Sequence, residues 1–201
     1  MSSNPTLSTA AFKLSSQQER AWRQHEAGVS AFAQCLIAID GDVNVDRLKS
    51  TLRQLIAKYE ILRTVFRRQT GVKLPFQVIQ ETPELRFKQV SGNDIDAILI
   101  RERESGWDVE NGPSVRVLLI STSTGNRLAL TLPAFCADAS TLKGLFLELA
   151  AVYGGQTTDA SEIVQYADLV EWQNEMLASD ETKPGREFWR DLCRNADFAA
   201  L

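Results

Sequence analysis

The stretch VDRLKSTLRQLIAKYEILRTVFR, residues 45–67, predicts a helix that leads almost directly into a strand. Its first apolar side chains are spaced three or four apart, as on one face of a helix: Leu48, Leu52, Leu55, Ile56 and Tyr59. Asp46 is an acidic residue suited to the first turn. From Leu62 to Arg67 the pattern changes to that of a short strand. A helix and a strand joined by so few residues indicate a mixed fold.

The sequence before this stretch predicts another helix and another strand. Residues 14–19 contain two overlapping capping boxes, Ser15 to Gln18 and Ser16 to Glu19, so we expect a helix from there to about Gly28 with Trp22 buried. Residues 31–39 are almost all apolar and end at the turn residues 40–42, which is typical of a mostly buried strand.

The sequence after this stretch interleaves more strands and helices. Residues 74–80 read as a strand, and 115–120 with 127–132 as a hairpin. Helices are expected over 93–106, over 161–176, over 183–195, and from a cap at Ser140 or Thr141 to the glycines at 154–155. No internal repeat or linker interrupts the chain. We therefore predict an α+β fold in one domain, residues 1–201, with residues 1–12 flexible.

Composition excludes several functional classes. The 201 residues carry 22 Lys and Arg against 26 Asp and Glu, a net charge of −4, so no general positive field would attract nucleic acid or an anionic membrane. No apolar run approaches a membrane span. The cysteines Cys35, Cys136 and Cys193 are far apart and form no CxxC pair, which argues against a disulfide framework or a metal site. A reducing cytoplasm is expected, and no cofactor is indicated.

Four segments resemble motifs of one family. Residues 14–22 resemble a Ser-x-x-Gln-x-Arg-x-Trp start, and residues 58–66 resemble Arg-His-Glu-x-Leu-Arg-Thr-x-Phe with only the leading Arg-His changed. Residues 166–173 resemble a Tyr-x-Asp-x-x-x-Trp helix, and 188–189 a Tyr-Trp pair. The chain thus resembles the N-terminal lobe of a condensation domain of nonribosomal peptide synthetases. This resemblance implies a chloramphenicol-acetyltransferase-like half domain, with a mixed β-sheet flanked by helices and the second lobe absent.

The remaining motif of that family, His-His-x-x-x-Asp-Gly, is degenerate in this chain. The matching residues begin with Pro133 and Ala134 and end with Asp138 and Ala139, so both histidines and the glycine are replaced. In the family the second histidine positions or deprotonates the attacking amine. A methyl group cannot accept a proton, so the base contribution, about 10²- to 10⁴-fold, is unavailable at Ala134. Catalytic residues are therefore not assigned.

The resemblance also implies structural roles for nearby residues. The family aspartate pairs with the arginine of the second motif, so we expect an Arg63–Asp138 ion pair that holds the loop. Cys136 could replace the nucleophile, but the only histidine, His25, lies on a distant helix and is expected to be solvated. A buried, inert thiol is the favoured interpretation.

The sequence also offers a few candidate residues for binding a partner. A basic group could contact an acidic carrier protein, or could simply be a solvated strand face: Arg63, Arg67, Arg68 and Lys73. Three tryptophans are expected to pack in the core or at its edge, although Trp189 or the neighbouring Phe188 could lie on a partner surface; the three are Trp107, Trp172 and Trp189.

Two functional hypotheses follow. In the first, the chain is a noncatalytic, truncated condensation-like domain that serves as a structural or interaction module for an adjacent adenylation domain or a carrier protein. Its open face would then favour a partner or a homo-oligomer. In the second, it is an excised lobe of a condensation or acyltransferase enzyme whose active site needs the missing half.

Overall fold

The computed structural model describes residues 11–29, 32–82, 84–112, 114–157 and 163–195. In chain order the elements are β1 (Ala11–Phe12), α1 (Ser16–Glu26), β2 (Phe32–Ile39), α2 (Val45–Lys58), the 3₁₀ helix η1 (Glu60–Arg63), β3 (Thr64–Arg67), β4 (Phe76–Ile79), β5 (Arg86–Ser91), α3 (Ile95–Glu104), β6 (Arg116–Thr122), β7 (Gly125–Pro133), α4 (Ala139–Tyr153), α5 (Tyr166–Ala178), the 3₁₀ helix η2 (Asp180–Thr182) and α6 (Lys183–Asn195).

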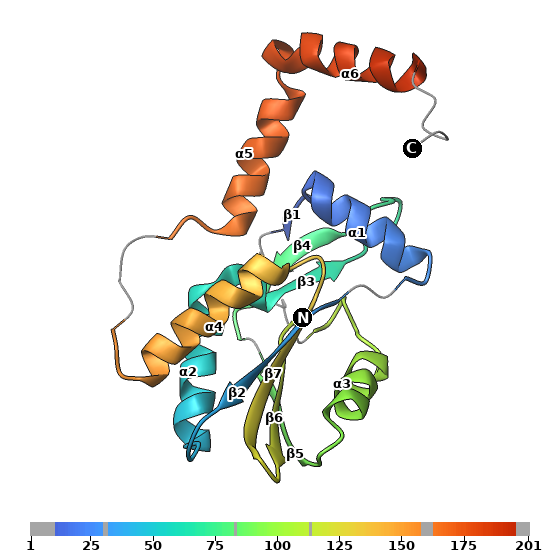
Figure 1. Cartoon of the computed structure of the whole chain (residues 1–201). Helices are drawn as coiled ribbons and strands as arrows, with labels where there is room; N and C mark the ends of the chain where they lie inside the picture. The colour runs from blue at the N-terminus through green and yellow to red at the C-terminus, as the bar shows by residue number, and fades with distance from the viewer. Residues whose placement is uncertain (1–10, 30–31, 83, 113, 158–162, 196–201) are drawn as a thin grey trace, which may run out of the picture.

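Two sheets form the centre of the fold (Figure 1). The larger has the order β2-β7-β6-β5, in which β2 and β6 both pair antiparallel with β7 while β5 and β6 are parallel. A parallel pair needs a crossover connection, and α3 supplies it. The smaller sheet has the order β1-β4-β3 and is antiparallel. The expected α+β fold with a mixed sheet and flanking helices is confirmed.

Helices cover both faces of the larger sheet (Figure 1). Along β6, Val117 packs into the main core with α2 and α4, whereas its neighbours Leu118 and Ile120 pack with Ile98 of α3. Side chains alternate between the faces of a strand, so one apolar strand serves both cores. Trp22 of α1 is buried in the main core, as its spacing predicts.

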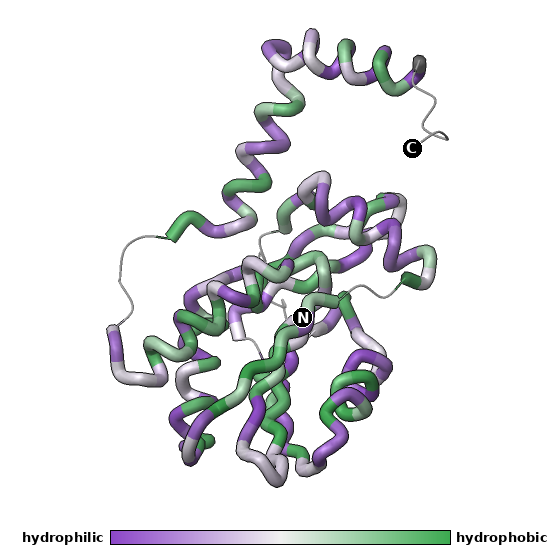
Figure 2. The backbone as a smooth tube through the Cα atoms, in the orientation of Figure 1, coloured by the Kyte–Doolittle hydropathy of each residue, from purple (hydrophilic) through white to green (hydrophobic). Residues whose placement is uncertain are grey.

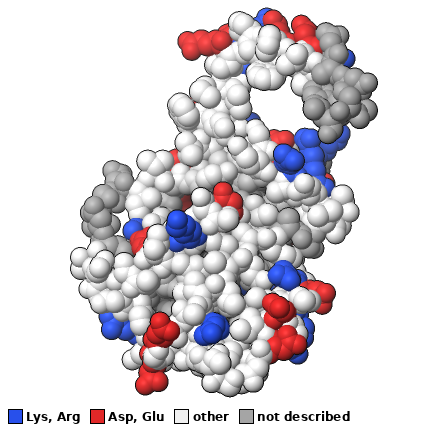
Figure 3. Space-filling model, viewed as in Figure 1, with Lys and Arg blue, Asp and Glu red and all other residues white. Residues whose placement is uncertain are grey.

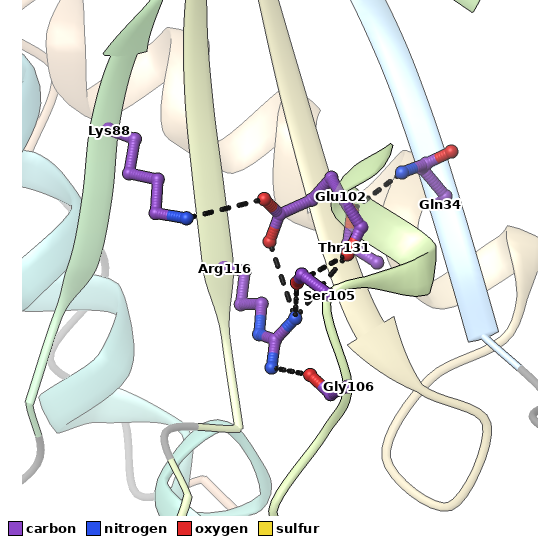
Figure 4. Close-up of polar contacts among 7 residues, drawn as sticks. All are labelled: Gln34, Lys88, Glu102, Ser105, Gly106, Arg116 and Thr131. Atoms are coloured by element: carbon purple, nitrogen blue, oxygen red, sulfur yellow. Dashed lines mark hydrogen bonds and ion pairs between the residues drawn. The ribbon is translucent and has the colours of Figure 1, made fainter. Parts of the chain in front are cut away.

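A buried ion pair fixes α3 to the sheet (Figure 4). The Arg116 guanidinium lies 3.5 Å from the Glu102 carboxylate, donates to Ser105 Oγ at 2.8 Å and to the Gly106 carbonyl, and lies over the Trp107 ring, 3.8 Å from its centroid. Both charged side chains are buried. Trp107 therefore packs at the edge of the core, as expected.

Several element bounds differ from the sequence prediction. The strand expected from Leu62 begins only at Thr64, because local hydrogen bonds from Leu62 N to the Tyr59 carbonyl and from Thr64 Oγ1 to the Glu60 carbonyl form a 3₁₀ turn first. The strands β1 and β5 were not predicted. β1 includes two residues expected to be flexible, 11 and 12, while residues 1–10 lie outside the described part.

The hairpin of β6 and β7 and the helix α6 lie where the sequence predicts them. The helix expected from residue 161 begins at Tyr166, and 161–162 lie outside the described residues. Among the described helices, none has the length and apolar character needed to cross a bilayer.

Candidate functional site

The degenerate motif forms a tight loop between a buried strand and a helix. β7 ends at Pro133, and the amide of Cys136 donates to the Pro133 carbonyl at 2.9 Å, which turns the chain. α4 begins at Ala139. The resulting loop, residues 133–139, is called the motif loop below, and the side chain of Ala134 is exposed on it.

Asp138 caps the helix that follows the motif loop. Its Oδ1 accepts hydrogen bonds from the amide and from the hydroxyl of Thr141, both at 2.8 Å. These bonds favour the charged carboxylate and hold the pKa of Asp138 below its ordinary value. The helix cap is thus Asp138, and not Ser140 or Thr141 as the sequence suggested.

The ion pair expected between Arg63 and Asp138 is replaced by other contacts. Arg63 lies 3.2 Å from the carboxylate of Glu60 and donates to the Gln80 carbonyl at 2.7 Å. Asp138 is already satisfied by Thr141. Arg63 and Asp138 are each bonded to residues close by in the sequence. The expected ion pair between Arg63 and Asp138 is therefore not formed.

The middle of the motif loop packs against three aromatic side chains from two other elements, α1 and β3. The ring of Phe135 lies 4.9 Å from that of Phe66, 5.8 Å from that of Trp22 and 5.7 Å from that of His25, measured between centroids. His25 is therefore half-buried against the motif loop, and not a solvated residue far from it. The contact is with Phe135, the residue that follows Ala134.

A buried glutamine holds the backbone of the motif loop. Gln18 Nε2 donates to the Phe135 carbonyl at 3.2 Å and to Gln77 Oε1 at 2.8 Å. Gln18 Oε1 accepts from the amide of Ser15, and Gln77 Nε2 donates to the Lys13 carbonyl. Both carboxamides are almost fully buried. Buried polar groups require such partners, so this chain of bonds fixes the loop relative to α1 and β4.

A pocket of about 380 Å³ opens beside the motif loop. It is lined by residues of α1, η1, the motif loop, α4 and α5: Gln17, Gln18, Ile61, Ala134, Phe135, Cys136, Ala137, Asp138, Thr141 and Tyr166. The Tyr166 hydroxyl is tied to Ser15 Oγ at 2.8 Å. The lining also includes the methyl group of Ala134.

The thiol in the lining is inert. Cys136 is buried, and burial raises the pKa of its thiol to about 12. Only the thiolate is a nucleophile, so at neutral pH this sulfur behaves as a small apolar group. The prediction of a buried thiol is consistent with this geometry.

Two of the four residues in the predicted basic group, Arg63 and Arg68, lie within 4 Å of a carboxylate. Arg68 lies within 4 Å of both Glu26 and Glu110, and Arg67 donates to the Glu110 carbonyl. Two of the three tryptophans lie on the surface, contrary to expectation: Trp172 and Trp189 are 60% and 62% exposed. The expectation that both pack in or at the core is wrong, because α5 buries its opposite side and α6 has no buried side chain in the described part of the chain.

The described residues contain no group of three or more His, Cys, Asp or Glu side chains that could hold a metal ion.

Comparison with known proteins identifies the family. A family profile described as "Condensation domain" matches residues 9–200. The chain belongs to the condensation-domain family.

The relatives are much longer than this chain. Tyrocidine synthase 3 of Brevibacillus parabrevis is 26% identical over 190 residues, which are 92% of this chain and 3% of that synthase. The chain thus spans a small part of the synthetases it matches.

Solved condensation-type structures share the fold. The condensation domain of the monacolin K polyketide synthase MokA superposes with a TM-score of 0.78 at 23% identity, over 90% of this chain and 42% of that one. The X-domain in its complex with OxyB from teicoplanin biosynthesis gives 0.80 at 23% identity, over 98% and 45%. This chain spans just under half the length of each.

The segment that resembles the second family motif begins with two residues that contact α4. Lys58 and Tyr59 share the carboxylate of Glu148 on α4, and Tyr59 OH donates to it at 2.5 Å. Gln165, the residue just before α5, donates to the Lys58 carbonyl and accepts from the Glu60 amide. The start of α5 is therefore bonded to the turn between α2 and η1. These residues thus fix η1 beside the motif loop.

Sequence reasoning missed three residues that shape the site: Gln77, Glu148 and Tyr166 as a partner of Ser15. A glutamine in a strand and a glutamate on a helix resemble surface residues, so neither gives a signal in a single sequence. Gln18 was found, but only as half of a capping box. Its second side-chain role depends on contacts with residues 77 and 135, which the sequence cannot place.

Proposed function

We propose that this condensation-family chain is a noncatalytic module of nonribosomal peptide synthesis, which acts through its shape and its binding surfaces. The observation that carries the proposal is the exposed methyl group of Ala134 beside the pocket, at the position of the family's base. The neighbouring thiol of Cys136 stays protonated at neutral pH. A site without a positioned base loses the main advantage that a catalyst offers an attacking amine.

The order of the motif loop supports a role for shape. Gln18, Phe135 and Asp138 all make specific packing or hydrogen-bond contacts although the reactive residues are gone. In this proposal the fold that positions the motif loop is retained, while the reactive residues of the family are not. The X-domain from teicoplanin biosynthesis, which has the same fold, is solved in complex with a second protein, OxyB. By analogy, we propose protein binding as the role of this chain too.

We further propose that the partners are an adenylation domain or a carrier protein, in the cytoplasm. The relatives are large peptide synthetases, in which such domains would be neighbours of a condensation domain. Cys35, Cys136 and Cys193 are all free thiols, which suits a reducing compartment.

Binding can be measured directly. The probes are the adenylation and carrier domains encoded nearest to this chain in its own gene, titrated by calorimetry up to about 100 µM, where a micromolar complex is saturated. Saturable binding of either domain is expected. The Gln18→Ala variant loosens the motif loop, so it should bind more weakly than the original chain if the ordered loop supports the binding surface. If neither domain binds to folded protein, the proposal is wrong.

The alternative is an enzyme lobe, and the pocket of about 380 Å³ beside the motif loop is the observation in its favour. An enzyme would show amide formation that depends on a residue of that pocket. Turnover that survives purification and disappears in the Asp138→Asn variant, with the fold unchanged, would favour the enzyme over the binding module.

A further inference from the structure

A pocket of about 350 Å³, separate from the motif loop, is formed by β5, α3 and β6. It is called the α3 pocket below. Its lining combines charged and apolar side chains, among them Lys88, Val90, Ile98, Arg101, Glu102 and Leu118. All of them belong to the continuous unit β5-α3-β6, residues 86–122. One short part of the chain therefore supplies both the floor and the walls of this pocket.

The basic side chains of β5 lie on the face of the sheet that α3 covers. Phe87 packs against the main core and Val90 against the core beneath α3, so successive residues of β5 face opposite sides. Arg86 and Lys88 therefore share the face of Val90. β5 and β6 are parallel, and their register sets Arg86 beside Arg116. Two guanidinium groups are thus neighbours beside the α3 pocket.

Positive charge exceeds negative charge around this pocket. The carboxylate of Glu102 is shared, since it lies 3.5 Å from Arg116 and 3.8 Å from Lys88 (Figure 4). In the described residues no carboxylate lies within 4 Å of Arg86 or Arg101. Burial and, after it, the charge of Arg86 lower the pKa of Arg116. One carboxylate thus faces four basic side chains.

The hydrogen bonds of this cluster are incomplete as well. Both terminal nitrogens of Arg116 are bonded, to Ser105 Oγ and to the Gly106 carbonyl. Its Nε is buried and has no hydrogen-bond partner in the described part of the chain. The contact of Arg116 with Glu102, at 3.5 Å, is a long one. The cluster therefore has more donors than the single carboxylate satisfies.

The α3 pocket also has an apolar wall. Ile98 and Leu118 are buried in the core beneath α3, and Val90 packs against them. Figure 2 shows hydrophobic and hydrophilic positions mixed along α3. On the face of the molecule in Figure 3, basic and acidic side chains are interspersed, so no broad basic area competes with the pocket there. An apolar wall with a few charged groups is typical of small-molecule sites.

We propose that the α3 pocket binds a small organic phosphate monoester. Lys88 and Arg101 hold the phosphate, because both residue types form charge-assisted hydrogen bonds to phosphate oxygens. A phosphate monoester carries about 1.5 to 2 negative charges at pH 7, which offsets much of the local excess of positive charge. The apolar body of the ligand lies against Val90, Ile98 and Leu118. This site is independent of the motif loop and of the proposed function of the chain.

Phenyl phosphate is the probe, because it joins a phosphate to one apolar ring. Titration of the whole folded chain up to about 10 mM probe, followed by ¹H–¹⁵N NMR, should saturate with a Kd of about 1 mM or lower. The largest amide shifts should lie in β5 and α3. Benzyl alcohol and inorganic phosphate each supply one half of the ligand, so each should bind at least about fivefold more weakly.

Substitutions test the two phosphate-binding residues. Arg101→Ala and Lys88→Ala should each weaken the binding of phenyl phosphate about tenfold. The matched control is Lys143→Ala, which removes an exposed charge from α4 and should change the Kd by less than about twofold. All three side chains are exposed, so circular dichroism should show an unchanged fold.

Several results would overturn the proposal. One is a folded chain that shows no saturable shifts, and another is a set of shifts centred outside β5 and α3. Equal effects of the three substitutions would show that only the general charge of the chain matters. Benzyl alcohol that binds as tightly as phenyl phosphate would remove the role of the phosphate, and inorganic phosphate that does so would remove the role of the apolar wall.

Discussion

At the scale of single residues, the proposed function depends on Ala134, while Gln18 and Asp138 hold the loop around it. The replacement of a family imidazole by the methyl group of Ala134 is a prediction from the resemblance of the sequence to a motif. The partners of Gln18 and Asp138 could not be predicted from the sequence, because they depend on which segments the fold brings within 3 Å.

The Gln18 carboxamide is expected to make a large contribution to stability. Gln18→Ala leaves the Phe135 carbonyl and Gln77 Oε1 buried without this donor, which should lower the free energy of unfolding by about 2–3 kcal/mol. Gln17→Ala is the matched control, since Gln17 is the exposed neighbour on the same turn and should change stability by less than about 0.5 kcal/mol. Urea denaturation followed by circular dichroism measures both. Equal effects of the two variants would contradict the role of Gln18.

The Cys136 thiol is expected to resist alkylation. A pKa of about 12 leaves about one thiol in 10⁴ ionised at pH 8, and the side chain is buried. Iodoacetamide at pH 8 should therefore modify exposed Cys193 at least about 10²-fold faster than Cys136, as measured by peptide mass spectrometry. In urea the difference should disappear. Rapid modification of Cys136 in the folded chain would instead indicate an activated thiol.

The Asp138 cap is expected to depend on pH. Hydrogen bonds from Thr141 lower its pKa in the folded state, so its contribution to stability is present above its unfolded pKa of 3.8 and is lost as the pH falls through the lower folded value. Asp138→Ala should thus reduce the urea midpoint at pH 7 and have a smaller effect at pH 3. Asp138→Asn keeps an acceptor oxygen and should show no such change with pH. An Asp138→Ala effect that is the same at both pH values would contradict the assignment.

At the scale of elements, long amphipathic segments were predictable and short or polar ones were not. α2, α6 and the β6–β7 hairpin follow their spacing and turn signals. β5 has the sequence RFKQVS, which is mostly polar and forms a sheet edge only because β6 pairs with it. η1 arises from local hydrogen bonds in residues whose apolar pattern alone suits a strand. Strand pairing with β6 determines the structure of β5, and local hydrogen bonds determine that of η1, although the apolar pattern of each sequence favours another structure.

The attachment of α3 to the sheet is expected to depend on its buried ion pair. Glu102→Gln removes the charge that partners buried Arg116, which should cost about 3–5 kcal/mol. Glu104→Gln, an exposed change on the same helix, is the matched control and should be near neutral. The double variant Glu102→Leu with Arg116→Met should recover most of the loss, because no buried charge is left unpaired; Lys88, which lies 3.8 Å from Glu102, is exposed to solvent. Denaturant midpoints measure the stability of each variant. A stability of Glu102→Gln close to that of the original chain would show that the ion pair is unimportant.

At the scale of the whole molecule, the last two helices differ from the rest. Most large apolar side chains of the other elements pack around the two sheets, while α5 and α6 expose seven of theirs in the described residues. The sequence predicted both helices but not their exposure, because helical spacing shows which side chains share a face and not what covers that face.

The most direct measurement is a condensation assay read by mass spectrometry, with the folded chain, an acyl thioester on one carrier protein and an aminoacyl thioester on another. Because Ala134 replaces the family's base, amide product is expected at the same rate as in a reaction without this chain. Amide formation well above that background, abolished by Asp138→Asn while the fold is retained, would contradict the conclusion that the motif loop is kept for its shape alone.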